Sequence, residues 1–120
     1  MKNSLSERKC VPCEVGTPAL SDEEIEIYMS QLPEWEVRAI DRDGKPVKAI
    51  QRQFQFKDFV TAMDFLKKVA VISEAEKHHP DFCVHYSKVD ITIWTHAVKG
   101  LHENDFILAS KINEASVRYK

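Results

Sequence analysis

The sequence of 120 residues lacks the features that mark several large classes of protein. Its apolar runs are far shorter than the roughly 20 residues that a membrane-spanning helix needs, so we expect no membrane span. Residues 1–8 are polar and contain nothing like the apolar core of a signal peptide, which favours a cytoplasmic protein. Lysine and arginine total 17 against 19 acidic residues without a dense basic stripe, so we expect no direct binding of nucleic acid.

Cysteine is scarce as well, with three residues at positions 10, 13 and 83. An odd number without a secretory signal argues against a disulfide framework, so we expect reduced thiols. Cys10 and Cys13 form a Cys-x-x-Cys pair that could in principle hold zinc together with histidines. The second cysteine pair of a closed structural zinc site is missing, so we expect no metal site and keep metal or thiol chemistry as the minor alternative.

The length fits a single domain. Residues 1–20 contain prolines and a glycine and lack a sustained apolar period, so we predict a flexible lead-in before one domain over residues 21–120. Ser21 and Glu24 have the spacing of a capping box, which predicts that a helix begins there. Pro33 should end this helix.

Beyond this helix the pattern alternates hairpins and helices. The expected elements are a helix over residues 21–32, strands over 35–40 and 47–56, a helix over 58–77, strands over 82–86 and 89–95, and a helix over 105–117. An Asp-Gly step at residues 43–44 favours a tight hairpin turn. Two hairpins can merge into one four-stranded antiparallel sheet, and three one-sided helices can cover one face of it. We therefore predict an α+β fold in the order α-β-β-α-β-β-α.

The long helix over residues 58–77 is apolar on more than one side. Its apolar residues at helical spacing are Phe59, Ala62, Met63, Leu66, Val69 and Ala70, and we expect Met63, Leu66 and Ala70 to define its main apolar stripe. Other apolar residues lie off this stripe, namely Val60, Phe65, Val71 and Ile72. Part of this helix is therefore expected to pack against another subunit.

All five histidines lie between positions 78 and 102. His78 and His79 come where Pro80 must end the long helix, and the helix dipole favours a protonated imidazole at that end. Glu74 lies one turn before His78, so we expect its carboxylate to accept a hydrogen bond from that ring and to fix its tautomer. Such residues can form a positioned proton donor, although a solvated helix end explains the spacing equally well.

His96 ends the fourth predicted strand beside a loop, which is a common place for functional side chains. An exposed loop histidine explains it about as well. His85 and His102 have no comparable setting, and we expect neither to take part in chemistry. Asp105 is most simply an acidic residue in the first turn of the last helix, where the dipole favours it.

These residues resemble a known family, the pterin-4a-carbinolamine dehydratases, also called dimerisation cofactors of a homeodomain transcription factor. The family pattern is an acidic or polar residue, then three residues, His-His-Pro, an aromatic residue, a further histidine and a downstream aspartate. In this sequence the pattern falls on Glu74, His78, His79, Pro80, Phe82, His96 and Asp105. The resemblance covers residues 20–116 and agrees with the predicted order of elements.

The resemblance implies an enzyme that dehydrates 4a-hydroxytetrahydrobiopterin or a related pterin to the quinonoid dihydropterin, without a cofactor. Its catalytic residues would be His78, His79 and His96, supported by Glu74 and Asp105. Expelling hydroxide from C4a needs a proton donor, and forming the double bond to N5 needs a proton acceptor; histidine can do both near neutral pH. We favour His78 and His96 as acid and base, in an order left open, with His79 orienting the pterin.

The resemblance also implies partners. The sequence is most similar to the bacterial branch of the family, whose pterin comes from a phenylalanine hydroxylase, and family members form dimers that pair into tetramers. We therefore expect a cytoplasmic homo-oligomer, tetramer before dimer, that supports tetrahydrobiopterin recycling. The alternative is a non-catalytic dimerisation cofactor or transcriptional regulator with the same fold. A regulator would tolerate loss of His78 and His96, whereas an enzyme would lose its rate.

Overall fold

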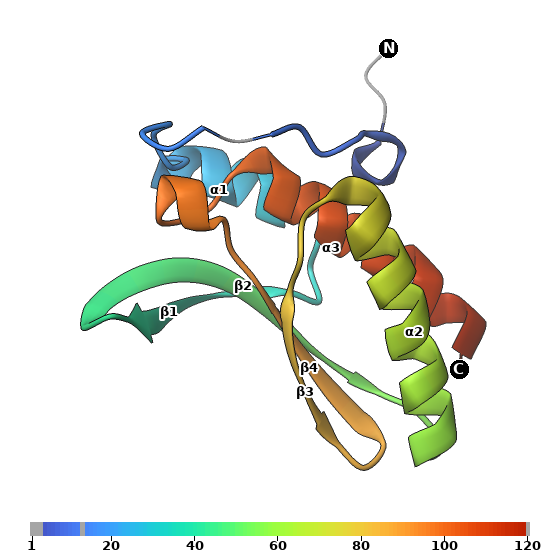
Figure 1. The fold of residues 1–120 in the computed structure, drawn as a ribbon. Coiled ribbons are helices and arrows are strands. Elements are labelled where there is room, and N and C mark those ends of the chain that lie inside the picture. The colour runs from blue at the N-terminus through green and yellow to red at the C-terminus, as the bar shows by residue number, and fades with distance from the viewer. Residues whose placement is uncertain (1–3, 13, 120) are drawn as a thin grey trace.

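The structure is a computed structural model that describes residues 4–12 and 14–119, which form an α+β fold of three α-helices and one four-stranded antiparallel sheet (Figure 1). The elements are α1 (Asp22–Met29), β1 (Glu36–Arg42), β2 (Lys45–Gln55), α2 (Phe59–Glu76), β3 (Asp81–His85), β4 (Lys88–Ile93) and α3 (Glu103–Ser116), with short 3₁₀ helices η1 (Leu5–Glu7), η2 (His96–Val98) and η3 (Val117–Tyr119). The predicted order α-β-β-α-β-β-α is confirmed. Within the described ranges, no helix is long and apolar enough to cross a membrane.

The sheet joins the two predicted hairpins in the order β1-β2-β4-β3, so β2 and β4 are central and β1 and β3 are the edges. In the first hairpin Asp43 and Gly44 have φ angles of 56° and 80°, which are the positive values that an Asp-Gly turn adopts easily. The hairpins meet where Ile50 of β2 lies opposite Ile93 of β4, and both side chains are fully buried. The inner face of the central strands therefore forms the floor of the core.

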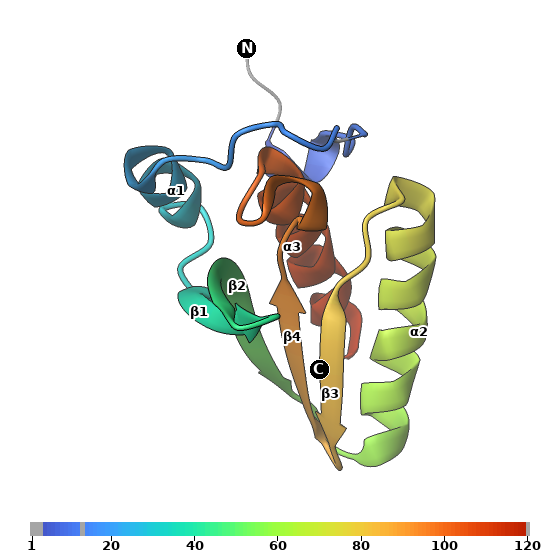
Figure 2. The same cartoon turned by 60° about the vertical axis from the view of Figure 1, so that its left-hand side comes forward.

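The three helices form the second layer, with α3 between α1 and α2 (Figure 2). The predicted capping box at the start of α1 is present, since the Glu24 N–H donates to Ser21 Oγ at 3.2 Å and the Ser21 N–H donates to Glu24 Oε1 at 2.9 Å. Helix α3 lies deepest, and Phe106, Leu108 and Ile112 are completely buried in it. The start of α3 is thereby held rigidly against the ends of β4 and α2.

The apolar stripe of α2 differs in part from the predicted one. Its buried residues are Ala62, Phe65, Leu66, Val69 and Ser73, which follow one face at the helical spacing of three and four. Met63 and Ala70, expected on this face, are exposed, whereas Phe65, expected to meet another subunit, is fully buried in the domain core. The prediction is therefore confirmed for Ala62, Leu66 and Val69 and wrong for Met63, Ala70 and Phe65. Because the helix is apolar on two sides, periodicity alone did not fix which side faces the sheet.

Part of the N-terminal lead-in packs on the domain, which the sequence did not predict. Leu5 in η1 is 3% exposed and belongs to the core cluster, and η1 contacts α3. The backbone N–H of Leu20 donates to the carbonyl of Leu101 at 2.9 Å. A single apolar residue in a polar segment gives no periodic signal, so this contact could not be inferred. The flexibility of the segment stays a prediction, and Cys13 lies outside the described residues.

Candidate functional site

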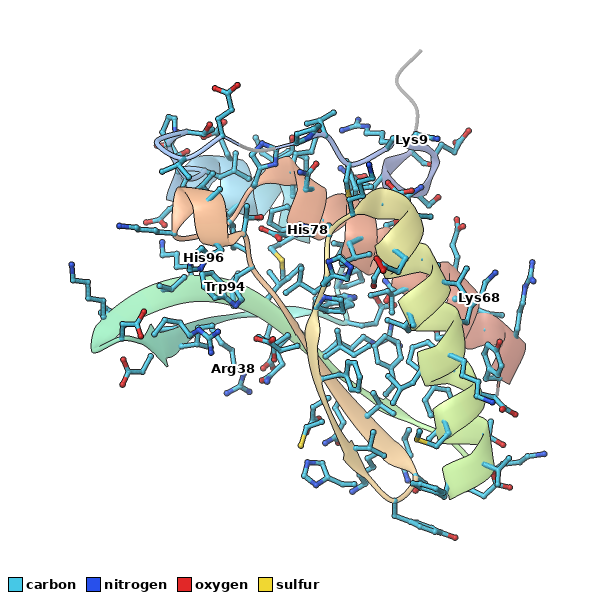
Figure 3. All side chains as sticks on the ribbon, viewed as in Figure 1. Lys9, Arg38, Lys68, His78, Trp94 and His96 are labelled. Carbon is cyan, nitrogen blue, oxygen red and sulfur yellow. The ribbon has the colours of Figure 1, made fainter. Side chains whose placement is uncertain are left out.

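A cavity of about 520 Å³ lies where α2 and β4 end and α3 begins. Its lining consists of residues 10–12, residues 75–79, residues 94–97 and Asn104. The cavity therefore brings together His78, His79 and His96, all three of the histidines that the sequence singled out. Figure 3 shows His78, Trp94 and His96 at the same end of the sheet. The volume falls within the range of about 300–1,000 Å³ that is usual for small-molecule sites.

His78 is held by a buried carboxylate. Its Nε2 lies 2.6 Å from Oδ1 of Asp105, a short separation that fits a hydrogen bond to a charged acceptor. The His78 side chain is 13% exposed and the Asp105 side chain is not exposed at all. Because a carboxylate only accepts, the His78 ring donates through Nε2, and a neutral ring then carries its lone pair on Nδ1.

Asp105 holds more than the histidine. The hydroxyl of Thr95 donates to both carboxylate oxygens, at 2.9 Å and 2.8 Å, and the backbone N–H of His102 donates to Oδ2 at 2.9 Å. Asp105 thus caps α3, ties that helix to the end of β4 and orients His78. The predicted place of Asp105 in the first helical turn is correct, but its network extends well beyond a favourable contact with the helix dipole.

Glu74 contacts a different histidine from the one expected. Its Oε2 lies 2.9 Å from Nε2 of His79, with the two side chains 77% and 61% exposed, and the expected pairing of Glu74 with His78 is wrong. The helix ends at Glu76, and Lys77 takes the left-handed conformation with φ of 54°. His78 therefore lies past the helix end, where the spacing of four residues no longer places two side chains on one face.

His96 opens η2 directly after β4 and is exposed. Its ring meets the ring of Trp94 edge-on, with centroids 5.4 Å apart and planes at 60°. The guanidinium carbon of Arg42, at the end of β1, lies 5.0 Å from the centroid of the Trp94 ring. Trp94 thus contacts one side of His96 and Arg42 lies over Trp94. Neither Trp94 nor Arg42 was singled out from the sequence.

The other two histidines lie outside the cavity lining. Nε2 of His85 lies 3.3 Å from Oδ2 of Asp90 on the sheet. Nδ1 of His102 accepts a hydrogen bond from the backbone N–H of Asn104 at 3.0 Å and so caps α3. Across the described parts of the chain, no group of three or more histidine, cysteine, aspartate or glutamate side chains is arranged to hold a metal ion.

Sequence reasoning also missed Thr95, Glu76 and the N-terminal residues that line the cavity. Thr95 is 4% exposed and directly precedes His96, so a strand-end hydroxyl beside a candidate histidine was the available signal. Glu76 lies between Glu74 and His78, which the sequence did single out. Its spacing is equally typical of a solvated residue at a helix end, so it gave no signal of a role in the site.

The model of a protein family described as "Pterin 4 alpha carbinolamine dehydratase" matches residues 18–115 of this sequence. The chain belongs to this family. The match spans all the elements from α1 to the last turns of α3, and with them His78, His79, His96, Glu74 and Asp105.

Curated members of the pterin 4 alpha carbinolamine dehydratase family are similar to this chain over most of its length. A protein from Halorhodospira halophila is 40% identical over 110 residues, which is 92% of this chain and 95% of the relative. One from Rickettsia canadensis is 42% identical over 109 residues, which is 90% of this chain and 94% of the relative. Both carry the name "Putative pterin-4-alpha-carbinolamine dehydratase".

Two solved structures share the fold of this family member. A Brucella melitensis protein, described as a transcriptional coactivator/pterin dehydratase, has a TM-score of 0.71 and 35% identity, over 82% of this chain and 98% of its own. A pterin dehydratase-like protein described as a RuBisCO assembly factor in the alpha-carboxysome has a TM-score of 0.57 and 18% identity, over 69% of this chain and 89% of its own. At that identity the second likeness concerns the fold alone.

Proposed function

We propose that this protein is a 4a-hydroxytetrahydropterin dehydratase, a hydro-lyase that works by histidine acid-base catalysis without a cofactor. The observation that carries the proposal is the convergence of His78, His79 and His96 on one cavity, with His78 fixed by a fully buried Asp105. A cavity with several imidazoles suits a reaction that needs both a proton donor and a proton acceptor near neutral pH. The family membership supports the same reaction class.

The reaction needs one proton to be delivered and another to be removed. The C4a–O bond breaks as the leaving hydroxyl takes a proton, and water departs. The N5–H proton goes to a base, and the electron pair of that bond forms the C4a=N5 double bond. The products are the quinonoid dihydropterin and one water molecule, so no electrons are exchanged with any other compound.

His78 is the better candidate for the base. Its Nε2 is committed to Asp105, so a bound pterin can exchange a proton with this ring only through Nδ1. When Nδ1 takes the N5 proton, the ring becomes an imidazolium that lies 2.6 Å from a carboxylate. An oriented base whose product cation faces a buried anion is the arrangement that general-base histidines use.

His96 is then the acid, and His79 orients the pterin. His96 is exposed beside Trp94, so solvent can return its proton after each turnover. His79 is exposed and pairs with the exposed Glu74, which suits a residue that binds the substrate through a hydrogen bond.

The biological setting belongs to the same proposal. A carbinolamine at C4a arises when an aromatic amino acid hydroxylase, such as phenylalanine hydroxylase, leaves its pterin hydroxylated. The protein would return that pterin to the reduction cycle in the cytoplasm. Tetrahydrobiopterin recycling is therefore the proposed role.

We also propose a homo-oligomer, tetramer before dimer. Strand β3 is a sheet edge whose residues are mostly exposed, and Phe82 on it is 56% exposed. On α2 the side chains of Val60 and Val71 are 66% and 61% exposed. Unpaired strand edges and apolar helix faces of this kind are commonly covered by a second copy of the chain.

The alternative is a binding protein, and the coactivator name of the Brucella structure is the observation that favours it. One experiment separates the two: stopped-flow decay of chemically generated 4a-hydroxytetrahydropterin, with and without the protein. The dehydratase accelerates the decay, and His78→Ala lowers that rate by about 10²-fold or more while the fold is retained. A folded protein that leaves the decay unchanged would be a binding module instead.

A further inference from the structure

The N-terminal segment runs across the top of the molecule in Figure 1, from the end of α2 over the start of α3. We call residues 8–12 of it the strap. Cys10, Val11 and Pro12 line the same cavity as the three histidines. The family match begins at residue 18, so the strap lies outside the part of the chain that defines the family.

The strap is fixed at several points. The backbone N–H of Cys10 donates to Oε1 of Glu76 at 2.8 Å, and the Cys10 thiol donates to the carbonyl of Asn104 at 3.5 Å. The side-chain amide of Asn104 makes two hydrogen bonds to Val11, accepting from its N–H at 3.0 Å and donating to its carbonyl at 2.6 Å. Arg8 forms an ion pair with Glu103 at 2.5 Å. Asn104 is 3% exposed, so these two hydrogen bonds to the strap are made by a buried side chain.

The anchors of the strap are neighbours of the proposed catalytic residues. Glu76 lies two positions before His78 at the end of α2, and Asn104 directly precedes Asp105 at the start of α3. Lys111 of α3 pairs with Glu76 at 3.2 Å. Although burial raises the pKa of Glu76, the hydrogen bonds from Cys10 and Lys111 lower it overall, so Glu76 holds the strap as a carboxylate. The strap thus joins the two helix ends that carry His78 and its partner.

We propose that the strap forms one wall of the pterin site and that Asn104 is a positioning residue, which sets how tightly the pterin binds. The inference rests on the proposed dehydratase function. A planar pterin in this cavity has residues 10–12 on one of its sides and the histidines on others. Releasing the strap opens that side to water and leaves the pterin less restrained, while the histidines keep their own partners. The effect therefore falls on binding rather than on proton transfer.

The first test compares two asparagines of the same helix. Asn104→Ala removes both hydrogen bonds to Val11, and we expect it to raise KM by about tenfold and to change kcat by less than about threefold. Asn113→Ala is the matched control, because it also removes two hydrogen bonds, from Trp35 and Arg52, and none of these three residues lines the cavity. The control should leave KM unchanged.

Glu76 offers a second pair of variants. Glu76→Ala removes the acceptor of the Cys10 N–H and should raise KM in the same way. Glu76→Gln keeps an oxygen that can accept this hydrogen bond and should restore most of the affinity. If all these variants share the wild-type KM, or if Asn113→Ala raises it equally, the strap is not a wall of the site.

The second test needs no variant, so it stands even if Asn104→Ala fails to fold. Iodoacetamide labelling of Cys10 is followed by peptide mass spectrometry, with Cys83 of β3, outside the cavity lining, as an internal reference in the same sample. Burial, and next the charge and hydrogen bonding of Glu76, raise the pKa of Cys10 to about 12, so the labelling is slow and is run at alkaline pH. Bound 7,8-dihydrobiopterin, a pterin that cannot be dehydrated, should slow labelling of Cys10 by about threefold or more relative to Cys83.

The outcomes separate the two proposals. A protein that neither binds 7,8-dihydrobiopterin nor accelerates the dehydration refutes the dehydratase function itself. A protein that binds this pterin and turns over, but labels Cys10 equally with and without it, keeps the dehydratase function and overturns the role of the strap. Pterin fluorescence confirms occupancy in the labelling sample.

Discussion

Replacing Asp105 by asparagine tests the central contact of the site. The carboxylate accepts hydrogen bonds from the ring of His78, the hydroxyl of Thr95 and the backbone N–H of His102. An asparagine side chain has nearly the same shape but presents one oxygen and one NH₂ group. The substitution therefore changes the direction of one hydrogen bond without opening a cavity.

The structure determines which hydrogen bond changes. At the Oδ2 position an NH₂ group would point at the N–H of His102, which belongs to the backbone and can only donate. The NH₂ group therefore takes the Oδ1 position and faces Nε2 of His78. His78 then has to accept a hydrogen bond through Nε2, so the proton of the neutral ring moves to Nδ1. Nδ1 thereby loses the lone pair that we propose takes the N5 proton.

The expected loss follows from this change of tautomer. A positioned general base contributes about 10²–10⁴-fold to a rate, so Asp105→Asn should lower kcat by about 10²-fold or more. Every donor around the amide keeps a partner, and the free energy of unfolding should fall by only about 1–3 kcal/mol, because charge assistance is lost. Asp105→Ala would instead leave the buried groups of Thr95 and His102 unpaired, so it mixes a folding effect with the catalytic one.

Stopped-flow decay of 4a-hydroxytetrahydropterin measures the rate, and ¹⁵N chemical shifts of the histidine ring measure the tautomer. Thr95→Val is the control, because it removes a hydroxyl from the same carboxylate without touching His78. Thr95→Val should lower the rate by less than about tenfold and leave the tautomer of His78 unchanged. A folded Asp105→Asn protein with the wild-type rate would refute the assignment of His78 as the base, whatever its tautomer.

The other predictions concern the remaining histidines, metal ions and assembly. His96→Ala should lower the rate by about 10²-fold or more, and added imidazole should restore part of it, because His96 is exposed. His78 is more buried, so imidazole should rescue His78→Ala less. Equal rescue of the two variants would contradict the proposed exposed acid and buried base. His85→Ala should change the rate by less than about twofold, since His85 pairs with Asp90 outside the cavity lining, and a larger loss than in His96→Ala would mean that the site is misassigned. Treatment with a chelator should leave the rate unchanged, whereas a strict need for zinc would overturn the mechanism. Light scattering at micromolar concentration should find a tetramer or a dimer, and a monomer alone would exclude the proposed assembly.

The fold could be predicted from the sequence because its local signals agree with one another. The capping box of Ser21 and Glu24 and the turn at Asp43 and Gly44 each specify one backbone geometry, and both are present. The orientation of α2 could not be predicted in the same way. Apolar residues cover two of its sides, and the choice between them depends on the sheet it packs against, which a helical period does not contain.

The pairing of Glu74 failed for a local reason. Helices that end in a left-handed residue most often have glycine there, and the sequence has Lys77 at this position. The hydrogen bonds from Lys77 N–H to the Glu74 carbonyl and from His78 N–H to the Ser73 carbonyl, at 3.4 Å and 3.2 Å, close the helix end despite the missing glycine. Without that signal, we expected helical geometry through Lys77, which would place Glu74 one turn before His78 on the same face.

The contact between His78 and Asp105 could not be predicted, since it joins residues 27 positions apart in different elements. Position 105 did carry a local signal, because His102 and Asp105 have the spacing of a capping box with a histidine in place of the usual hydroxyl residue. The contact of the strap with the cavity could not be predicted for another reason. Three of its hydrogen bonds, to Glu76 and Asn104, use only the backbone of the strap, so they place no requirement on its side chains and give no sequence pattern.

The position of His102 is a reason to expect no catalytic role for it, although it lies in the same cluster of five histidines. A neutral imidazole has one lone pair, and His102 uses the pair on Nδ1 to accept from the N–H of Asn104. Taking up a proton at that atom would remove the cap from the start of α3, next to Asp105. His102 therefore serves the site best as a neutral ring that stabilises the helix, while His78, whose free lone pair remains available, can take a proton without breaking any hydrogen bond of the fold.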